Sequence, residues 1–100
     1  LEGQYDSAGT AKNFATHFGT ARDQSVNPTT FTNTAVEVEE EMGITVNSDF
    51  TLTITMQVEQ WYENPFQWDF NVWNAPIMPI FDAQMKLKDN SSTVFTISIN

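Results

Sequence analysis

The sequence predicts an all-β protein: an antiparallel β-sandwich or barrel, jelly-roll or immunoglobulin-like, with an extended N-terminal arm that carries at most a short helix. Residues 50–58 alternate without a break between apolar and polar side chains, and residues 66–72 repeat the pattern. Residues 84–88 and 93–100 form a third pair of runs around a polar turn. Alternation with period two indicates strands, and several such runs at hairpin spacing favour a sandwich or barrel.

Length and composition allow one domain with one hydrophobic core. The chain has 100 residues, of which 40% are apolar and 13% aromatic, enough to fold without covalent cross-links. It has no cysteine, which excludes disulfide bridges and thiolate metal sites. We divide it into an N-terminal arm, residues 1–33, and a single antiparallel β domain, residues 34–100.

The arm is rich in small and polar residues. Four apolar residues within it recur at helical spacing: Ala11, Phe14, Ala15 and Phe18. This spacing predicts one or two helical turns that lay two phenylalanines on the body.

Residues 34–43 fit two structures. Thr34 and Glu37 match a helix capping box and Gly43 matches a helix stop. The alternation of valine and glutamate instead suits a strand, which we favour. The glutamates would then line a solvated edge that blocks stray strand pairing.

The hairpin prediction places the tryptophans. If residues 63–65 form the loop, residues 55–62 pair with residues 66–73, and Trp68 faces the core with Gln60 opposite its indole N–H. Trp61 and Trp73 then lie on the other face, about 20 Å apart along the strand.

That second face has two interpretations. Aromatic rings stack on sugars, and amides bond to sugar hydroxyls. A row of amide side chains between two tryptophans therefore predicts a binding site for a neutral glycan. Alternatively, the rings pack against a covering layer or another subunit. The residues of this candidate stacking site are Trp61, Trp73, Gln57, Gln67 and Asn71.

The same register sets Glu59 opposite Asp69. Like charges directly across a strand pair are destabilising. The register is therefore wrong, or one carboxyl group is protonated, or a calcium ion sits between the two.

The charge distribution excludes several partners. The net charge is −9, and ten carboxylates but no lysine or arginine occur between Arg22 and Lys86. Because nucleic acids and anionic membranes are bound through Lys and Arg, we expect no binding to either.

No enzyme or cofactor is predicted. His17 is the only histidine and has no acid or nucleophile near it in sequence, and no phosphate loop, zinc motif or EF-hand loop occurs.

The leading hypothesis is a non-enzymatic, self-associating structural β domain of an extracellular filament, surface layer or virion, whose partners are copies of itself or neighbouring structural subunits. Phe14, Phe18 and Phe31 are the predicted assembly anchors of the arm. The alternatives are a carbohydrate-binding module using Trp61 and Trp73, and a pore-forming hairpin over residues 50–58.

Overall fold

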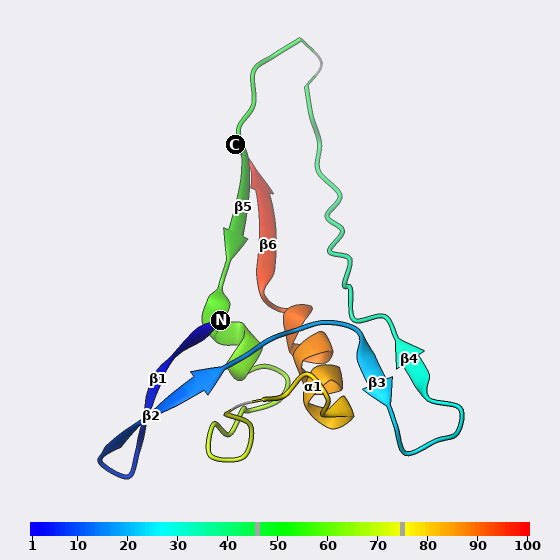
Figure 1. The fold of residues 1–100 in the computed structure, drawn as a ribbon. Coiled ribbons are helices and arrows are strands. Elements are labelled where there is room, and N and C mark those ends of the chain that lie inside the picture. Colours follow the sequence, from blue (N-terminus) through cyan, green and yellow to red (C-terminus); the bar gives the residue numbers. More distant parts are fainter. Residues whose placement is uncertain (46, 75) are drawn as a thin grey trace.

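The structure is a computed structural model that describes residues 1–45, 47–74 and 76–100 (Figure 1). Its elements are β1 (Glu2–Ser7), β2 (Thr10–Ala15), β3 (Ala21–Asp23), β4 (Thr30–Thr32), β5 (Leu52–Met56), the 3-10 helix η1 (Val58–Tyr62), α1 (Phe81–Ser91) and β6 (Phe95–Ile99). The strands form three separate two-stranded antiparallel sheets, β1–β2, β3–β4 and β5–β6. The chain is therefore strand-rich with little helix, and the described strands do not join into one closed sandwich or barrel.

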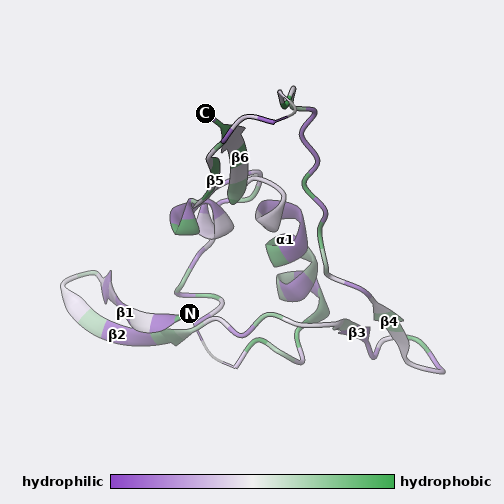
Figure 2. Ribbon diagram, turned by 90° about the horizontal axis from the view of Figure 1, so that it is seen from above, coloured by the Kyte–Doolittle hydropathy of each residue, from purple (hydrophilic) through white to green (hydrophobic). Residues whose placement is uncertain are grey.

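The molecule is flat and extended. The β1–β2 and β3–β4 hairpins lie on opposite sides of α1 (Figures 1 and 2), and the β5–β6 pair rises away from the helix. The radius of gyration is 17.5 Å, compared with about 13 Å for a compact chain of this length. Three small sheets around one helix leave much of the chain without a second covering layer.

The core is small and aromatic. Trp68, Ile77, Ala83 and Leu87 form a buried cluster. Four half-buried rings pack against it: Trp61, Tyr62, Phe70 and Trp73. The prediction that Trp68 is buried is confirmed, but its indole N–H donates to the carbonyl oxygen of Trp73 at 3.3 Å rather than to Gln60.

Helix α1 corrects the predicted last hairpin, because residues 84–88 are helical and form no strand. The buried residues of α1 are Ala83, Gln84, Leu87, Asn90 and Ser91. They recur at helical spacing, but three of them are polar and bond to backbone groups, so the apolar pattern alone did not reveal the helix.

The predicted strand over residues 66–73 is also wrong. This segment is a loop, and the side chain of Asp69 accepts a hydrogen bond from the backbone N–H of Asn71 at 2.8 Å. The backbone N–H of Trp68 bonds to the carbonyl of Tyr62 at 2.8 Å. A strand forms within the predicted run 50–58, but β5 covers only Leu52–Met56, Val58 begins η1, and the partner strand is β6.

The arm differs from its prediction as well. Residues 10–15 form strand β2 rather than a helix, and they pair with β1 through a turn in which Ala8 and Gly9 have φ of 51° and 86°. These positive values suit the tight turn that matches strand twist. Residues 34–43 form neither a helix nor a paired strand.

Candidate assembly surface

The β5–β6 ribbon separates its side chains by chemistry. The antiparallel register puts Leu52 opposite Ile99, Ile54 opposite Ile97 and Met56 opposite Phe95. Because side chains alternate across a strand, these six share one face, which we call the ribbon face. The other face carries Thr53, Thr55, Thr96 and Ser98.

The β5 half of the ribbon face is open to solvent, whereas Phe95, Ile97 and Ile99 of β6 are partly buried. Leu52, Ile54 and Met56 are 51%, 62% and 51% exposed, although all three are apolar. Phe50, which precedes the strand, is also half-exposed. A two-stranded ribbon is marginally stable in water unless its apolar face is covered. The sequence identified this face by its alternation, but as an interior face; the missing covering layer was not predictable from the pattern.

The base of the β5–β6 ribbon is fixed to the body, the name we give to α1, η1 and the core cluster around Trp68. The backbone N–H of Gln57 donates to the carbonyl oxygen of Val94 at 2.8 Å, and Val94 is fully buried. The Phe95 ring packs edge-on against Trp61 with centroids 6.2 Å apart. The apolar face is therefore presented by a part of the chain that is packed and hydrogen-bonded.

The predicted anchors occupy three different environments. Phe14 packs against Phe70 and Tyr62, with ring centroids at 4.7 and 6.1 Å, and so joins β2 to the body. Phe18 is 38% exposed, and Phe31, on β4, is 66% exposed. Their role in assembly stays a prediction, and Phe31 is the ring with the most surface to offer a partner.

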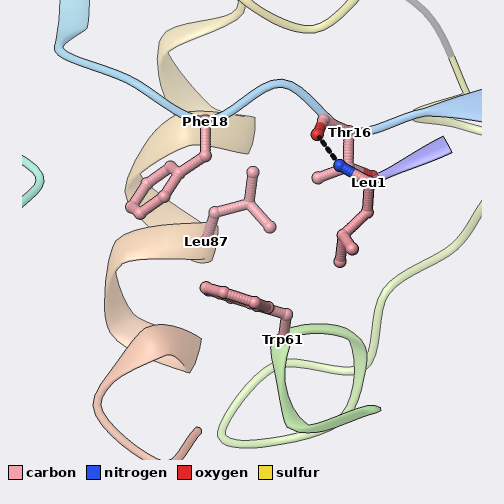
Figure 3. A pocket seen from close by; sticks show the side chains of 5 residues that line it. All are labelled: Leu1, Thr16, Phe18, Trp61 and Leu87. Atoms are coloured by element: carbon pink, nitrogen blue, oxygen red, sulfur yellow. Dashed lines mark hydrogen bonds between the residues drawn. The ribbon is translucent and has the colours of Figure 1, made fainter. Parts of the chain in front are cut away.

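An apolar pocket of about 180 Å³ lies beside α1 (Figure 3). It is lined by Leu1, Thr16, Phe18, Trp61 and Leu87. The Nε1 atom of Trp61 is buried and has no hydrogen-bond partner, which costs about 1–3 kcal/mol for a buried polar group. The pocket is smaller than the 300 Å³ or more of typical ligand sites and is suited to about one ring.

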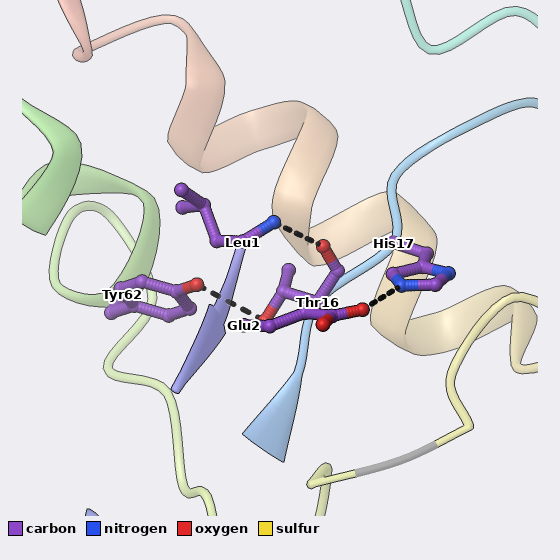
Figure 4. A network of polar contacts seen from close by, with 5 residues as sticks. All are labelled: Leu1, Glu2, Thr16, His17 and Tyr62. Atoms are coloured by element: carbon purple, nitrogen blue, oxygen red, sulfur yellow. Dashed lines mark hydrogen bonds and ion pairs between the residues drawn. The ribbon is translucent and has the colours of Figure 1, made fainter. Parts of the chain in front are cut away.

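A polar network joins the first strand to the body (Figure 4). The Leu1 amino group donates to the Thr16 carbonyl at 2.9 Å, and the Tyr62 hydroxyl donates to Thr16 Oγ1 at 3.0 Å. Burial raises the pKa of Tyr62 above its ordinary value of 10.0. His17 Nε2 lies 2.9 Å from Glu2 Oε1, and this hydrogen bond lowers the pKa of Glu2. His17 thus has an acidic neighbour that is far from it in sequence.

The predicted stacking row does not form, because residues 66–73 are not a strand. Trp73 packs on Trp68 with ring centroids 4.8 Å apart, and Lys86 Nζ lies 5.0 Å from the Trp73 ring centroid. The remaining predicted residues have separate surroundings: Gln57 precedes η1, Gln67 donates to the Tyr62 carbonyl at 3.4 Å, and Asn71 accepts from Ser7 at 2.7 Å. The two outer tryptophans are half-buried packing rings, and Trp61 also lines the apolar pocket beside α1.

The predicted calcium pair also loses its geometric basis. Glu59 lies in η1 and Asp69 in the following loop, so the two do not face each other across a strand pair. Within the described residues, no group of three or more His, Asp or Glu side chains is placed to hold a metal ion. Calcium binding by this pair stays a prediction from sequence.

Comparisons of the chain with protein-family models, curated proteins and solved structures gave no match. Across the described ranges, no helix combines the length and apolar character needed to cross a bilayer.

Proposed function

We propose that the chain is a non-enzymatic structural module that self-associates through the ribbon face of β5–β6. The observation that carries the proposal is the row of apolar side chains on a packed ribbon with half or more of Leu52, Ile54 and Met56 exposed. A second copy that lays its ribbon face on this one would form a sandwich between two chains. The predicted sandwich thus becomes a property of the assembly.

The accessible surface area of the chain supports a second copy as the partner of the ribbon face. The accessible surface is 6933 Å², whereas a compact monomer of 11.3 kDa exposes about 5,700 Å². The difference of about 1,200 Å² belongs to the whole extended chain and not to the ribbon face alone, and it exceeds the roughly 800 Å² that each partner buries in an interface of standard size. Self-association can therefore supply the burial that the single chain lacks.

Charge also favours a second copy at this position. The ribbon carries no ionisable side chain on either face, so packing two ribbons buries no charge. The net charge of −9 lies elsewhere and repels other copies over longer distances. We expect added salt to strengthen association, because it screens this repulsion without weakening an apolar contact.

The proposed setting is an extracellular filament, surface layer or virion, in which copies of one chain or neighbouring structural subunits repeat. Such assemblies need a contact between subunits rather than a catalytic cleft, and an uncharged ribbon face supplies that contact.

The test is a pair of substitutions on one strand. Ile54→Lys places a charge at the centre of the ribbon face and should leave the protein monomeric at concentrations where the unmodified chain associates. Thr55→Lys introduces the same charge on the opposite face and should preserve association. Light scattering with sedimentation velocity measures both. A wild-type chain that stays monomeric up to millimolar concentration would contradict the proposal.

A second candidate, binding of a neutral carbohydrate, depends on Trp61. This residue lines the apolar pocket, where its ring could stack on a sugar. Trp61→Ala should then cost about 1–3 kcal/mol of sugar affinity, as lost stacking does at hot spots. Trp73→Ala, at a ring outside the pocket lining, separates local stacking from the two-tryptophan site predicted from sequence. Tryptophan fluorescence unchanged by millimolar neutral mono- and disaccharides would rule this candidate out.

A further inference from the structure

Residues 35–44 lie in the long connection between β4 and β5 and belong to no sheet (Figure 1). In the described part of the chain, none of the backbone N–H or C=O groups of residues 36–44 makes a hydrogen bond. The segment therefore has a full set of strand-pairing groups available.

Its side chains repeat the two-faced chemistry of the ribbon. The even-numbered residues are Val36, Val38, Glu40, Met42 and Ile44, and all but the glutamate are apolar. The odd-numbered residues include Glu37, Glu39 and Glu41. As an added strand, the segment would extend the apolar ribbon face on one side and place most of its carboxylates on the polar side.

Strand β5 has one free edge, and its hydrogen-bonding groups are identifiable. The backbone N–H and C=O of Thr51 both bond to Asn100, at 3.1 and 3.0 Å. In an antiparallel pair such residues alternate along the strand, so odd-numbered residues of β5 face β6. Leu52, Ile54 and Met56 therefore direct their backbone N–H and C=O groups to the free edge, where the described residues supply no partner.

We propose that segment 35–44 of one copy adds to the free edge of β5 in a second copy, antiparallel and with Val38 opposite Ile54. This register sets Val36 opposite Met56 and Glu40 opposite Leu52, so two apolar pairs continue the ribbon face and one carboxylate lies at its end. Glu39 then lies beside Thr53 on the polar face. The inference rests on the proposed function, because it names the segment that joins neighbouring copies.

The position of the chain's own segment favours a second copy as the donor. In both views segment 35–44 runs on the β6 side of the ribbon, and Figure 1 shows it running in the same direction as β6. The free edge of β5 faces the other way. Donation from copy to copy is a head-to-tail contact, which grows into a filament unless the rotation between copies closes a ring.

Cross-linking tests the register directly. The chain has no cysteine, so engineered pairs report without background. Glu39 and Thr53 would form a non-hydrogen-bonded pair, with Cα atoms about 4.5 Å apart, within the range of a disulfide. Glu39→Cys protein mixed with Thr53→Cys protein should form a mixed disulfide several-fold faster than Asp6→Cys protein mixed with Thr53→Cys protein, because exposed Asp6 lies on β1.

A matched proline pair tests the hydrogen bonds. In the proposed register the N–H of Glu40 bonds to Leu52 of the next copy, whereas the N–H of Glu39 points away. Glu40→Pro should hold the protein at the dimer made by the ribbon face, and Glu39→Pro should assemble beyond it, as the unmodified chain does. Both variants lose one carboxylate, and neither position makes a backbone hydrogen bond within the single chain.

The outcomes separate this inference from the proposed function. If Ile54→Lys abolishes association but neither proline has an effect and no mixed disulfide forms, the strand addition is wrong and the ribbon-face contact stands. If a chain carrying both cysteines closes on itself while the mixture does not react, the donor is not a second copy. If the wild-type protein is monomeric, both proposals fail.

Discussion

Helix α1 and strand β5 each carry a leucine in an apolar stripe, and the two leucines have opposite surroundings. Leu87 is 1% exposed and packs in the core cluster, whereas Leu52 is 51% exposed on the ribbon face. The body buries its apolar cluster and bonds most of its buried polar groups within one chain; the exception is Nε1 of Trp61. The ribbon satisfies the backbone groups between its two strands, but it leaves the apolar side chains of β5 exposed. The comparison indicates that burial in the body stabilises the single chain, whereas the apolar side chains of β5 contribute little burial within it.

Truncating the two leucines should give the largest contrast. Leu87→Ala should lower the free energy of unfolding by about 3–4 kcal/mol, because it removes buried methyl groups and leaves a cavity. Leu52→Ala should change it by less than about 0.5 kcal/mol in dilute protein, where the side chain faces water. Chemical denaturation followed by circular dichroism measures both values. Equal losses would contradict the division between body and ribbon.

Asn90 tests the polar side of the comparison. Its fully buried amide accepts a hydrogen bond from the Phe66 N–H and donates to the carbonyls of Trp61 and Phe66, each at 2.8 Å. Asn90→Ala should cost about 2–3 kcal/mol, because three backbone groups lose their partner. Thr55→Ala, on the polar face of the ribbon, is the control and should be close to neutral in the same denaturation experiment.

Alkaline pH should destabilise the body by less than either the Leu87 or the Asn90 substitution does. The pKa of Tyr62 is raised by burial, so its contribution to stability is complete below pH 10.0 and is lost as the pH rises through the folded-state value. Tyr62→Phe removes that ionisation, and its melting temperature should fall less between pH 9 and pH 11 than that of the unmodified chain. Scanning calorimetry gives the melting temperatures, and an absorbance titration follows the phenolate. Parallel melting curves would mean that Tyr62 ionises equally in both states.

Local alternation in the sequence predicted where β5 and β6 form. It did not predict which strands pair with each other. Both β5 and β6 were expected, because their side chains alternate without interruption. Residues 66–72 alternate equally well, yet they form a loop, whose Phe66 backbone is bonded by the distant Asn90. Local pattern contains no information on that long-range contact.

Helix α1 was missed for a related reason. Its inner face includes Gln84, Asn90 and Ser91, which read as surface residues in sequence and are buried because backbone carbonyls accept their hydrogen bonds. The ribbon face was predictable from the sequence only in part. Alternation showed which face of β5 is apolar, but not that the described residues of the chain leave that face exposed.

The bond between Gln57 and Val94, together with the packing of Phe95 on Trp61, has a consequence for how copies would be spaced. Because the base of the β5–β6 ribbon is held rigidly, the angle between the ribbon and the body would set the angle between neighbouring copies in an assembly. Substitutions at Val94 should therefore alter the pitch or diameter of an assembled object, as seen by electron microscopy, more than they alter how readily it forms.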